Sequence, residues 1–254
     1  MEKFEQLING YNTYLESDEE IIPKIKEPDG VYFYVPPLEY SNVIYAMYEI
    51  YVRKNFAISK QLFYRAALIP QFMSEKFDRR VLDSGMYQIS YALLSDNRDI
   101  IKSYSILKNK INHETGIGYQ VPNAVQNILL EDRDKLDWNI HCIGRLIKHP
   151  KLMHLEGYLD AFVGFKNHDQ ALIEQGLKKL IAKPKKLDDH PLIPRFFSRD
   201  AAGLNKLAWM RGMEIDLKSS LVPVELMPVQ PLEKYEGYDF LDELWDKPLS
   251  IPER

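Results

Sequence analysis

The sequence predicts an all-α fold: a single domain of stacked antiparallel helical hairpins, loosely repeat-like, that ends in an extended proline-rich C-terminal segment. Apolar residues recur at helical spacing along most of the chain, strand signals are few, and short polar turns separate the apolar-striped segments. A chain of 254 residues can also bury about three quarters of its unfolded surface without disulfides or metals. We therefore expect one domain over residues 1–254: an N-terminal helix and extended lead-in (1–37), a helical body (38–212) and an acidic, aromatic tail (213–254).

The N-terminal region is expected to hold two helices joined by an extended segment. The first helix should run from about Glu2 to Glu16, and the second should begin after Pro37. Between them, Val31–Val35 (VYFYV) is β-branched and aromatic and lies between turn residues, a pattern typical of a short strand. Because no partner strand is evident, we predict an extended packing segment there instead. The second helix is rich in tyrosine, which suits either a core with hydroxyls at its edge or a protein interface.

Apolar stripes mark further helices in the body. One stripe recurs at i, i+4, i+7, i+11 and i+15 and comprises Leu62, Ala66, Ile69, Met73 and Phe77. Pro70 is expected to kink or shift that helix, because proline lacks the N–H that a helix interior needs. Another stripe comprises Ile100, Tyr104, Leu107 and Ile111.

Two stretches resemble each other and suggest repeated helical hairpins. The stretch from Tyr91 (YALLSDNRDIIKSYSIL) and the stretch from Ala161 (AFVGFKNHDQALIEQGL) each contain a helix, a four-residue polar turn and another helix. The turns lie at 95–98 and 167–170. Stacked hairpins bury a face that one pair alone leaves exposed. Chance similarity of two helix turns is the alternative, since neither stretch carries a known repeat consensus.

Composition and charge favour a cytoplasmic protein that binds neither a membrane nor a nucleic acid. Hydrophobic residues make up 45% and charged residues 28%, as in ordinary globular proteins, and no apolar run is long enough to span a bilayer. The acidic N-terminus lacks the pattern of a secretion signal, and the single cysteine, Cys142, suits a reducing compartment. The net charge of −4 disfavours nucleic acid, although residues 177–218 carry ten bases against five acids. The sequence leaves the oligomeric state open.

No residue pattern predicts catalysis, a cofactor or a metal, so we expect a protein that is not an enzyme. Five histidines lie between positions 141 and 190 without zinc-ligand spacing, and Cys142 lies among apolar residues typical of a buried structural thiol. The glycine-containing segment 115–119 (TGIGY) fits no phosphate loop and is predicted to be a flexible turn before a helix that Pro122 can start. An enzyme whose site is assembled around His141 and Cys142 by tertiary convergence is the alternative.

The last fifth of the chain carries the most specific pattern. A helix over 201–209 (AAGLNKLAW) is followed by the glycine at 212 and by the proline-paced segment 221–241 (LVPVELMPVQPLEKYEGYDFL). This order resembles the bacterial immunity protein 49 family, whose members often close with a helix ending in glycine and a segment of the kind LVPxELLPxxPLxxYxxxYDFL. The segment 162–169 (FVGFKNHD) is also similar to a hairpin turn of that family. Here Gly237 leaves only two residues between Tyr235 and Tyr238, and the first 150 residues offer no matching motif.

The resemblance implies a cytoplasmic, all-α immunity protein, encoded beside a polymorphic toxin, that binds the toxin domain and neutralises it by occlusion. The acidic and aromatic side chains of the tail would suit a basic toxin such as a nuclease. The predicted partner-binding residues are Glu233, Tyr235, Glu236, Tyr238, Asp239 and Asp242. Alternatively, the tail side chains dock the tail onto the helical body. A helical-repeat adaptor for another protein complex is the alternative function.

Overall fold

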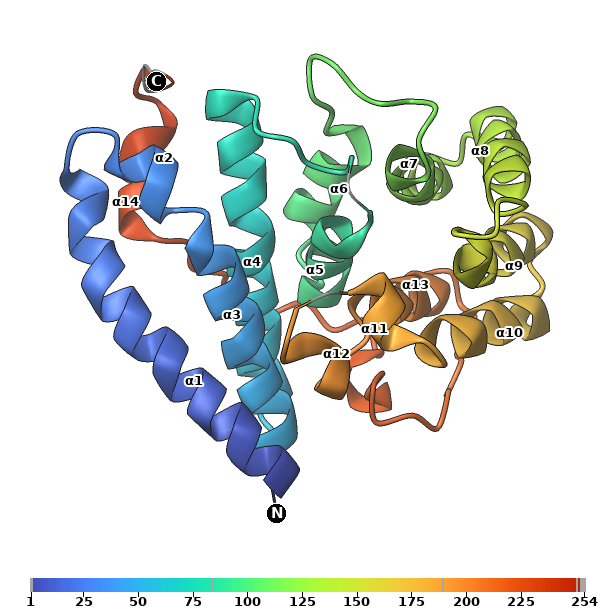
Figure 1. The fold of residues 1–254 in the computed structure, drawn as a ribbon, viewed down its shortest axis with the longest axis horizontal. Coiled ribbons are helices and arrows are strands. Elements are labelled where there is room, and N and C mark those ends of the chain that lie inside the picture. The colour runs from blue at the N-terminus through green and yellow to red at the C-terminus, as the bar shows by residue number, and fades with distance from the viewer. Residues whose placement is uncertain (1, 84, 189, 250, 252–254) are drawn as a thin grey trace.

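A computed structural model describes residues 2–83, 85–188, 190–249 and 251, and these residues form an all-α fold without β-strands (Figure 1). The helices and helical turns are α1 (Glu2–Ile21), η1 (Ile22–Lys26), α2 (Gly30–Tyr34), α3 (Pro37–Tyr48), the π-helical turn η2 (Glu49–Arg53), α4 (Phe56–Phe77), α5 (Tyr87–Ser95), α6 (Arg98–Ile106), α7 (Ile117–Leu129), α8 (Arg133–Leu146), η3 (Met153–Leu155), α9 (Glu156–Asn167), α10 (Gln170–Ile181), α11 (Pro184–Leu187), α12 (Ile193–Phe196), α13 (Arg199–Met210), η4 (Val224–Leu226) and α14 (Asp239–Trp245). The predicted fold class is confirmed. None of the described helices is both long and apolar enough to cross a bilayer.

The N-terminal layer consists of α1, α3 and α4, which lie side by side (Figure 1). Tyr11 of α1 stacks on Tyr48 of α3, with ring centroids 4.2 Å apart, and meets Tyr45 edge-on at 5.1 Å. Tyr45 and Tyr48 of α3 therefore pack against α1, and the Tyr45 hydroxyl donates to the Asp18 carboxylate at 2.9 Å. The connection to α4 bends at Lys54, which adopts the left-handed conformation, and Asn55 then caps α4 with its side chain.

The centre of the core is formed by α4, α5 and α13. Phe63 of α4 stacks with Tyr91 of α5 at 6.1 Å and with Phe197 at 5.6 Å. α13 approaches α5 so closely at Gly203 that a Cβ atom there would collide with Ser90. The helix α4 runs through Pro70 without a break, so the apolar stripe from 62 to 77 belongs to one helix.

The two turns predicted from internal similarity have the same construction. After α5, Asp96 adopts the left-handed conformation (φ 61°), and Asn97 caps α6 by accepting a backbone N–H at 2.9 Å. After α9, His168 adopts the same conformation (φ 54°), and Asp169 caps α10 by accepting a backbone N–H at 3.0 Å. In both turns a polar residue with positive φ ends one helix, and the residue after it caps the next helix with its side chain.

The C-terminal tail crosses the molecule from α13 to α14. The Ile215 carbonyl accepts hydrogen bonds from Asn205 at 3.2 Å and from Trp209 at 3.1 Å, which fixes the start of the tail on α13. At the other end α14 packs on α4, where the rings of Trp245 and Phe72 lie 5.2 Å apart. Figure 1 shows α14, in red, beside α2 and on the opposite side of the molecule from α8 and α10.

Two expectations about the N-terminal half are wrong. Residues 30–34 form the helix α2 and not an extended segment, because the left-handed Asp29 folds the chain back and the carbonyl of Asp29 accepts the N–H groups of Tyr32 and Phe33. Because the described residues include no strand that could pair with it, this segment satisfies its backbone locally, despite its β-branched and aromatic composition. The first helix is also longer than expected and ends at Ile21.

Three further expectations are corrected in the middle and at the end of the chain. Within the segment 115–119, residues 117–119 already belong to α7 and Gly116 is its N-cap, so the helix begins earlier than expected and Pro122 lies inside it. Ile111 lies in the loop beyond α6 and is 74% exposed, so it does not continue the stripe of that helix. The tail is not extended throughout, because Asp239 and Asp242 occupy the first turn of α14, where acidic residues favour a helix N-terminus.

Candidate functional site

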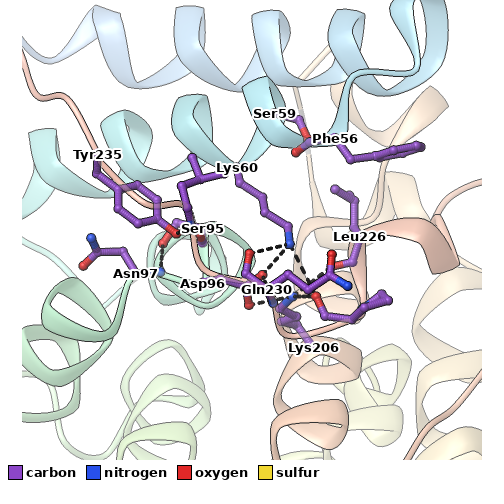
Figure 2. A network of polar contacts seen from close by, with 12 residues as sticks. Phe56, Ser59, Lys60, Ser95, Asp96, Asn97, Lys206, Leu226, Gln230 and Tyr235 are labelled. Atoms are coloured by element: carbon purple, nitrogen blue, oxygen red, sulfur yellow. Dashed lines mark hydrogen bonds and ion pairs between the residues drawn. The ribbon is translucent and has the colours of Figure 1, made fainter.

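Asp96, Lys60 and Lys206 form a buried ionic cluster at the meeting of α5, α4 and α13 (Figure 2). Lys60 Nζ lies 2.7 Å from Asp96 Oδ2, and Lys206 Nζ lies 2.6 Å from Asp96 Oδ1. The side chain of Lys60 is 6% exposed, and those of the other two residues are fully buried. Solvent and salt therefore screen these ion pairs only weakly.

The ammonium groups of the cluster also hold the main chain of the tail. Lys206 Nζ donates to the carbonyls of Leu226 and Pro228, both at 2.9 Å. Lys60 Nζ donates to the carbonyl of Gln230 at 3.0 Å. Figure 2 shows both lysine side chains converging on Asp96 beside this stretch of the tail. The cluster thus joins three helices and the tail at one point.

The composition of the tail explains why lysines suit this position. The prolines at 223, 228 and 231 carry no N–H, so the backbone of this segment has more acceptors than donors. An ammonium group carries only donors and satisfies such carbonyls. The N–H that the segment does provide at Gln230 donates to Asp96 Oδ2 at 3.1 Å.

Burial changes the pKa of the Lys206 ammonium group. Desolvation lowers the pKa of its ammonium group to about 8, although the Asp96 carboxylate acts in the opposite direction. At pH 7 the group is still mostly charged. Two cations and one anion then share a buried site, and the tail carbonyls offset the remaining positive charge.

Two of the six predicted partner-binding residues dock the tail onto the helical body. The Tyr235 hydroxyl donates to the Ser95 carbonyl at 2.7 Å and accepts the Leu232 N–H at 3.0 Å. The Tyr238 hydroxyl accepts a hydrogen bond from Asn42 at 2.7 Å. Burial raises the pKa of both tyrosines, as expected for phenol groups that pack against protein. These contacts match the alternative in which the aromatic residues of the tail are structural.

The other four predicted residues, the acids, are exposed. They are Glu233, Glu236, Asp239 and Asp242. The main chain of Glu236 is fixed, because its carbonyl accepts from Gln61 at 2.6 Å and from Arg65 at 3.0 Å. Its carboxylate is 62% exposed and pairs with Lys234, which lowers the pKa of Glu236. The tail therefore turns its tyrosines inward and its carboxylates outward.

A second group of buried charges lies beside a cavity of about 400 Å³ between α3, α5, α9 and α13. Arg199 of α13 pairs with Asp188 at 2.8 Å and donates to the Tyr91 hydroxyl at 2.7 Å. Its guanidinium lies 4.4 Å from the centroid of the Tyr87 ring, a cation–π geometry. This arginine therefore links α13 to α5 and to the segment before α12.

Two carboxyl groups near Arg199 titrate close to neutral pH. Burial raises the pKa of Glu39 to about 7, with Arg199 acting in the opposite direction. Burial also raises the pKa of Asp200 to about 6, although the Tyr158 hydroxyl donates to its carboxylate and opposes the shift. Of the two, Asp200 lines the cavity. An acid with a raised pKa at a cavity is common at functional sites, and both groups can take up and release protons near neutral pH. No sequence motif marked them.

The alternative of an enzyme site around His141 and Cys142 finds no support in the positions of these two residues. His141 is exposed on α8 with its ring 5.8 Å from that of Trp138, and Cys142 is half-buried on the same helix. Within the described part of the chain, no three His, Cys, Asp or Glu side chains are grouped so that they could hold a metal.

No known protein family, no curated protein and no solved structure matches this chain. What the protein does is therefore inferred from its own residues and from the pattern of its closing segment.

Replacing Lys206 with methionine should lower the free energy of unfolding by about 3–5 kcal/mol, measured by urea denaturation. Asp96 would keep only one cation, and the carbonyls of Leu226 and Pro228 would lose a donor. Amide hydrogen exchange over residues 224–235 should become faster at the same time. Lys234→Met, at an exposed lysine of the same tail, is the control and should change stability by about 0.5 kcal/mol or less. Equal effects of the two variants would contradict an anchoring role.

Stability should depend on Glu39 between about pH 4.5 and pH 7. The folded-state pKa of about 7 lies above the ordinary value of 4.5, so the folded protein binds a proton more tightly than the unfolded chain. The resulting contribution, at most about 3 kcal/mol, is fully present below pH 4.5 and is lost as the pH rises through 7.

The test compares urea unfolding of the wild type and Glu39→Gln from pH 5 to pH 8. The stability of the wild type relative to this variant should fall as the pH rises. Glu19→Gln, at an exposed acid, should leave the pH profile unchanged. Parallel profiles for the wild type and Glu39→Gln would show that Glu39 titrates as an ordinary carboxyl group.

Proposed function

We propose that this protein is an immunity protein that binds a cognate bacterial toxin and neutralises it by occlusion, without catalysis. The observation that carries the proposal is the division within the tail: anchoring tyrosines face the body, and four carboxylates remain exposed. The resemblance of the same segment to the immunity protein 49 family supports it. A cytoplasmic location follows from the proposal, because the protein must meet the toxin inside the cell that it protects.

The anchoring of the tail supports a role in tight binding. An interface that is ordered before the partner arrives loses less conformational entropy on association. Here the segment around Pro228 is fixed by Lys60 and Lys206, and the main chain at Glu236 is fixed by α4. The exposed acids thus extend from a backbone that is already in place.

The charge of the tail favours a basic toxin domain, such as a nuclease. Among the described residues, the ion pair made by its four predicted acids is that of Glu236 with Lys234, and both side chains of this pair are exposed. Complementary charge mainly accelerates association and selects the partner, while affinity comes from a few buried contacts. Inhibition by occlusion requires only such a surface, so no reactive group of this chain has a part in it.

A helical-repeat adaptor is the second candidate, and Trp138 is the observation that favours it. This residue is 60% exposed on α8, at the side of the molecule opposite α14 (Figure 1). Exposed tryptophan is characteristic of binding hot spots. An adaptor would use this helical face and would not require a toxic partner.

The proposal is tested by co-expression with the product of the neighbouring gene. That product should arrest growth when expressed alone, and this protein should restore growth and form a stoichiometric complex with it. Growth arrest without rescue, together with the absence of a complex, would refute the proposal. A harmless neighbour that still co-purifies would favour the adaptor.

Reversing the charge of Glu236, Asp239 and Asp242 to lysine should slow association with the toxin at low salt, by about tenfold or more, and much less at high salt. Surface plasmon resonance at two salt concentrations measures this effect. The matched control reverses Asp134, Asp137 and Glu174, which lie on α8 and α10 and change the net charge equally. If both triple variants associate at the same rate, net charge and not the tail governs the encounter.

A further inference from the structure

Beside the acidic tail lies an apolar groove of about 390 Å³ between α1, α3, α4 and Tyr238. Its lining is dominated by apolar side chains and aromatic rings. The residues that line it are Leu15, Asp18, Glu19, Ile22, Pro23, Asn42, Tyr45, Leu62, Arg65 and Tyr238. Leu15 is 41% exposed and Ile22 is 38% exposed, so both present apolar surface to solvent.

The polar groups in the floor of the groove are already paired with one another. Asp18 accepts hydrogen bonds from Ser41 at 2.6 Å and from Tyr45 at 2.9 Å. Asn42 donates to Tyr238 at 2.7 Å. A ligand entering the groove would therefore meet satisfied polar atoms and apolar surface, which favours an apolar group over a polar one. The same bonds give the groove a fixed shape.

Arg65 is the cation closest to the groove, and its charge is engaged. Its guanidinium lies 5.1 Å from the centroid of the Tyr238 ring, and its Nε donates to the Glu236 carbonyl. It therefore supports the wall of the groove.

Carboxylates stand on both sides of the groove. On α1, Glu19 lines the groove, and Glu16 and Glu20 are exposed within one turn of it. On the other side, Asp239 follows Tyr238 directly, and Asp242 lies one turn further along α14. The apolar surface is thus flanked by two rows of negative charge.

We propose that this groove receives an apolar side chain of the toxin, leucine or an aromatic residue, that is flanked in the toxin by lysine or arginine. The inference rests on the proposed function and names the contact that would supply its affinity. Large apolar side chains seated in preformed pockets, with charges around them, are the usual energetic centres of interfaces. A second copy of this chain is a poor occupant, because a two-fold contact through this face would bring its acidic residues together.

The test uses the double variant Leu15→Ser with Ile22→Ser and the purified toxin domain from the neighbouring gene. Both residues are exposed, so the variant should fold, and an unchanged melting temperature verifies this. The Kd should rise by about tenfold or more, mainly through faster dissociation, and this effect should persist at high salt. A matched double control, Ile106→Ser with Ile111→Ser, removes two exposed isoleucines on another part of the molecule, 67% and 74% exposed.

A second variant tests the charge of the occupant. Glu19→Lys should slow association at low salt, because it places a positive charge where the toxin is proposed to carry one. Unchanged binding by both groove variants, with tight binding by the wild type, would overturn the groove and leave the immunity function intact. If Trp138→Ala loses binding while the groove variants bind fully, the groove proposal is refuted and the toxin contacts α8 instead. Failure of the wild type to bind any toxin would refute the function and the groove together.

Discussion

The arrangement of this molecule depends on one buried carboxylate, Asp96, and the two lysines that pair with it. Asp96 directly follows α5, and the lysines come from α4 and α13 and also bind the carbonyls of the tail. Burying three charges is costly, and buried ion pairs often contribute little net stability compared with apolar residues of similar volume. Their effect here is better described as specificity, because only one placement of the tail satisfies both ammonium groups and the acceptor-rich backbone of the proline segment.

That placement decides which side chains of the tail are available to a partner. With the main chain fixed at Pro228 and Gln230, Tyr235 reaches the Ser95 carbonyl, next to Asp96. Tyr238 then packs beside Asn42, and the acids between and after the tyrosines are left in solvent. The acidic surface is therefore a consequence of a buried ionic cluster. The groove beside it depends on the same placement, because Tyr238 forms one of its walls.

Local pattern predicted most helices and both similar turns, because periodicity and side-chain caps are encoded within a few residues. The prediction failed at 30–34. Composition favoured an extended segment there, but the left-handed conformation of Asp29 folds the chain back into a helix. Local pattern could not reveal the ionic cluster, since Lys60 and Lys206 lie 146 positions apart and resemble solvated helix lysines. The six tail residues are predicted as one group, although the acids at 233, 236, 239 and 242 recur every third residue and the tyrosines at 235 and 238 share that spacing. The spacing separates the two sets but does not tell which of them faces the body, and only tertiary packing decides that.

Some side chains anchor the tail to the body, and others are proposed to contact the partner. This separation has a consequence for partner choice. The anchors use main-chain carbonyls and tyrosine hydroxyls, which tolerate changes at the intervening positions. The acids and the exposed apolar residues of α1 make few contacts within the protein, so substitutions there should have little effect on folding. A chain built in this way can acquire a new partner by changing Glu19, Leu15 or Asp242 while the Asp96 cluster keeps the tail in place. Such freedom suits a protein whose proposed partner belongs to a polymorphic toxin group, since specificity can diverge without loss of the scaffold that presents it.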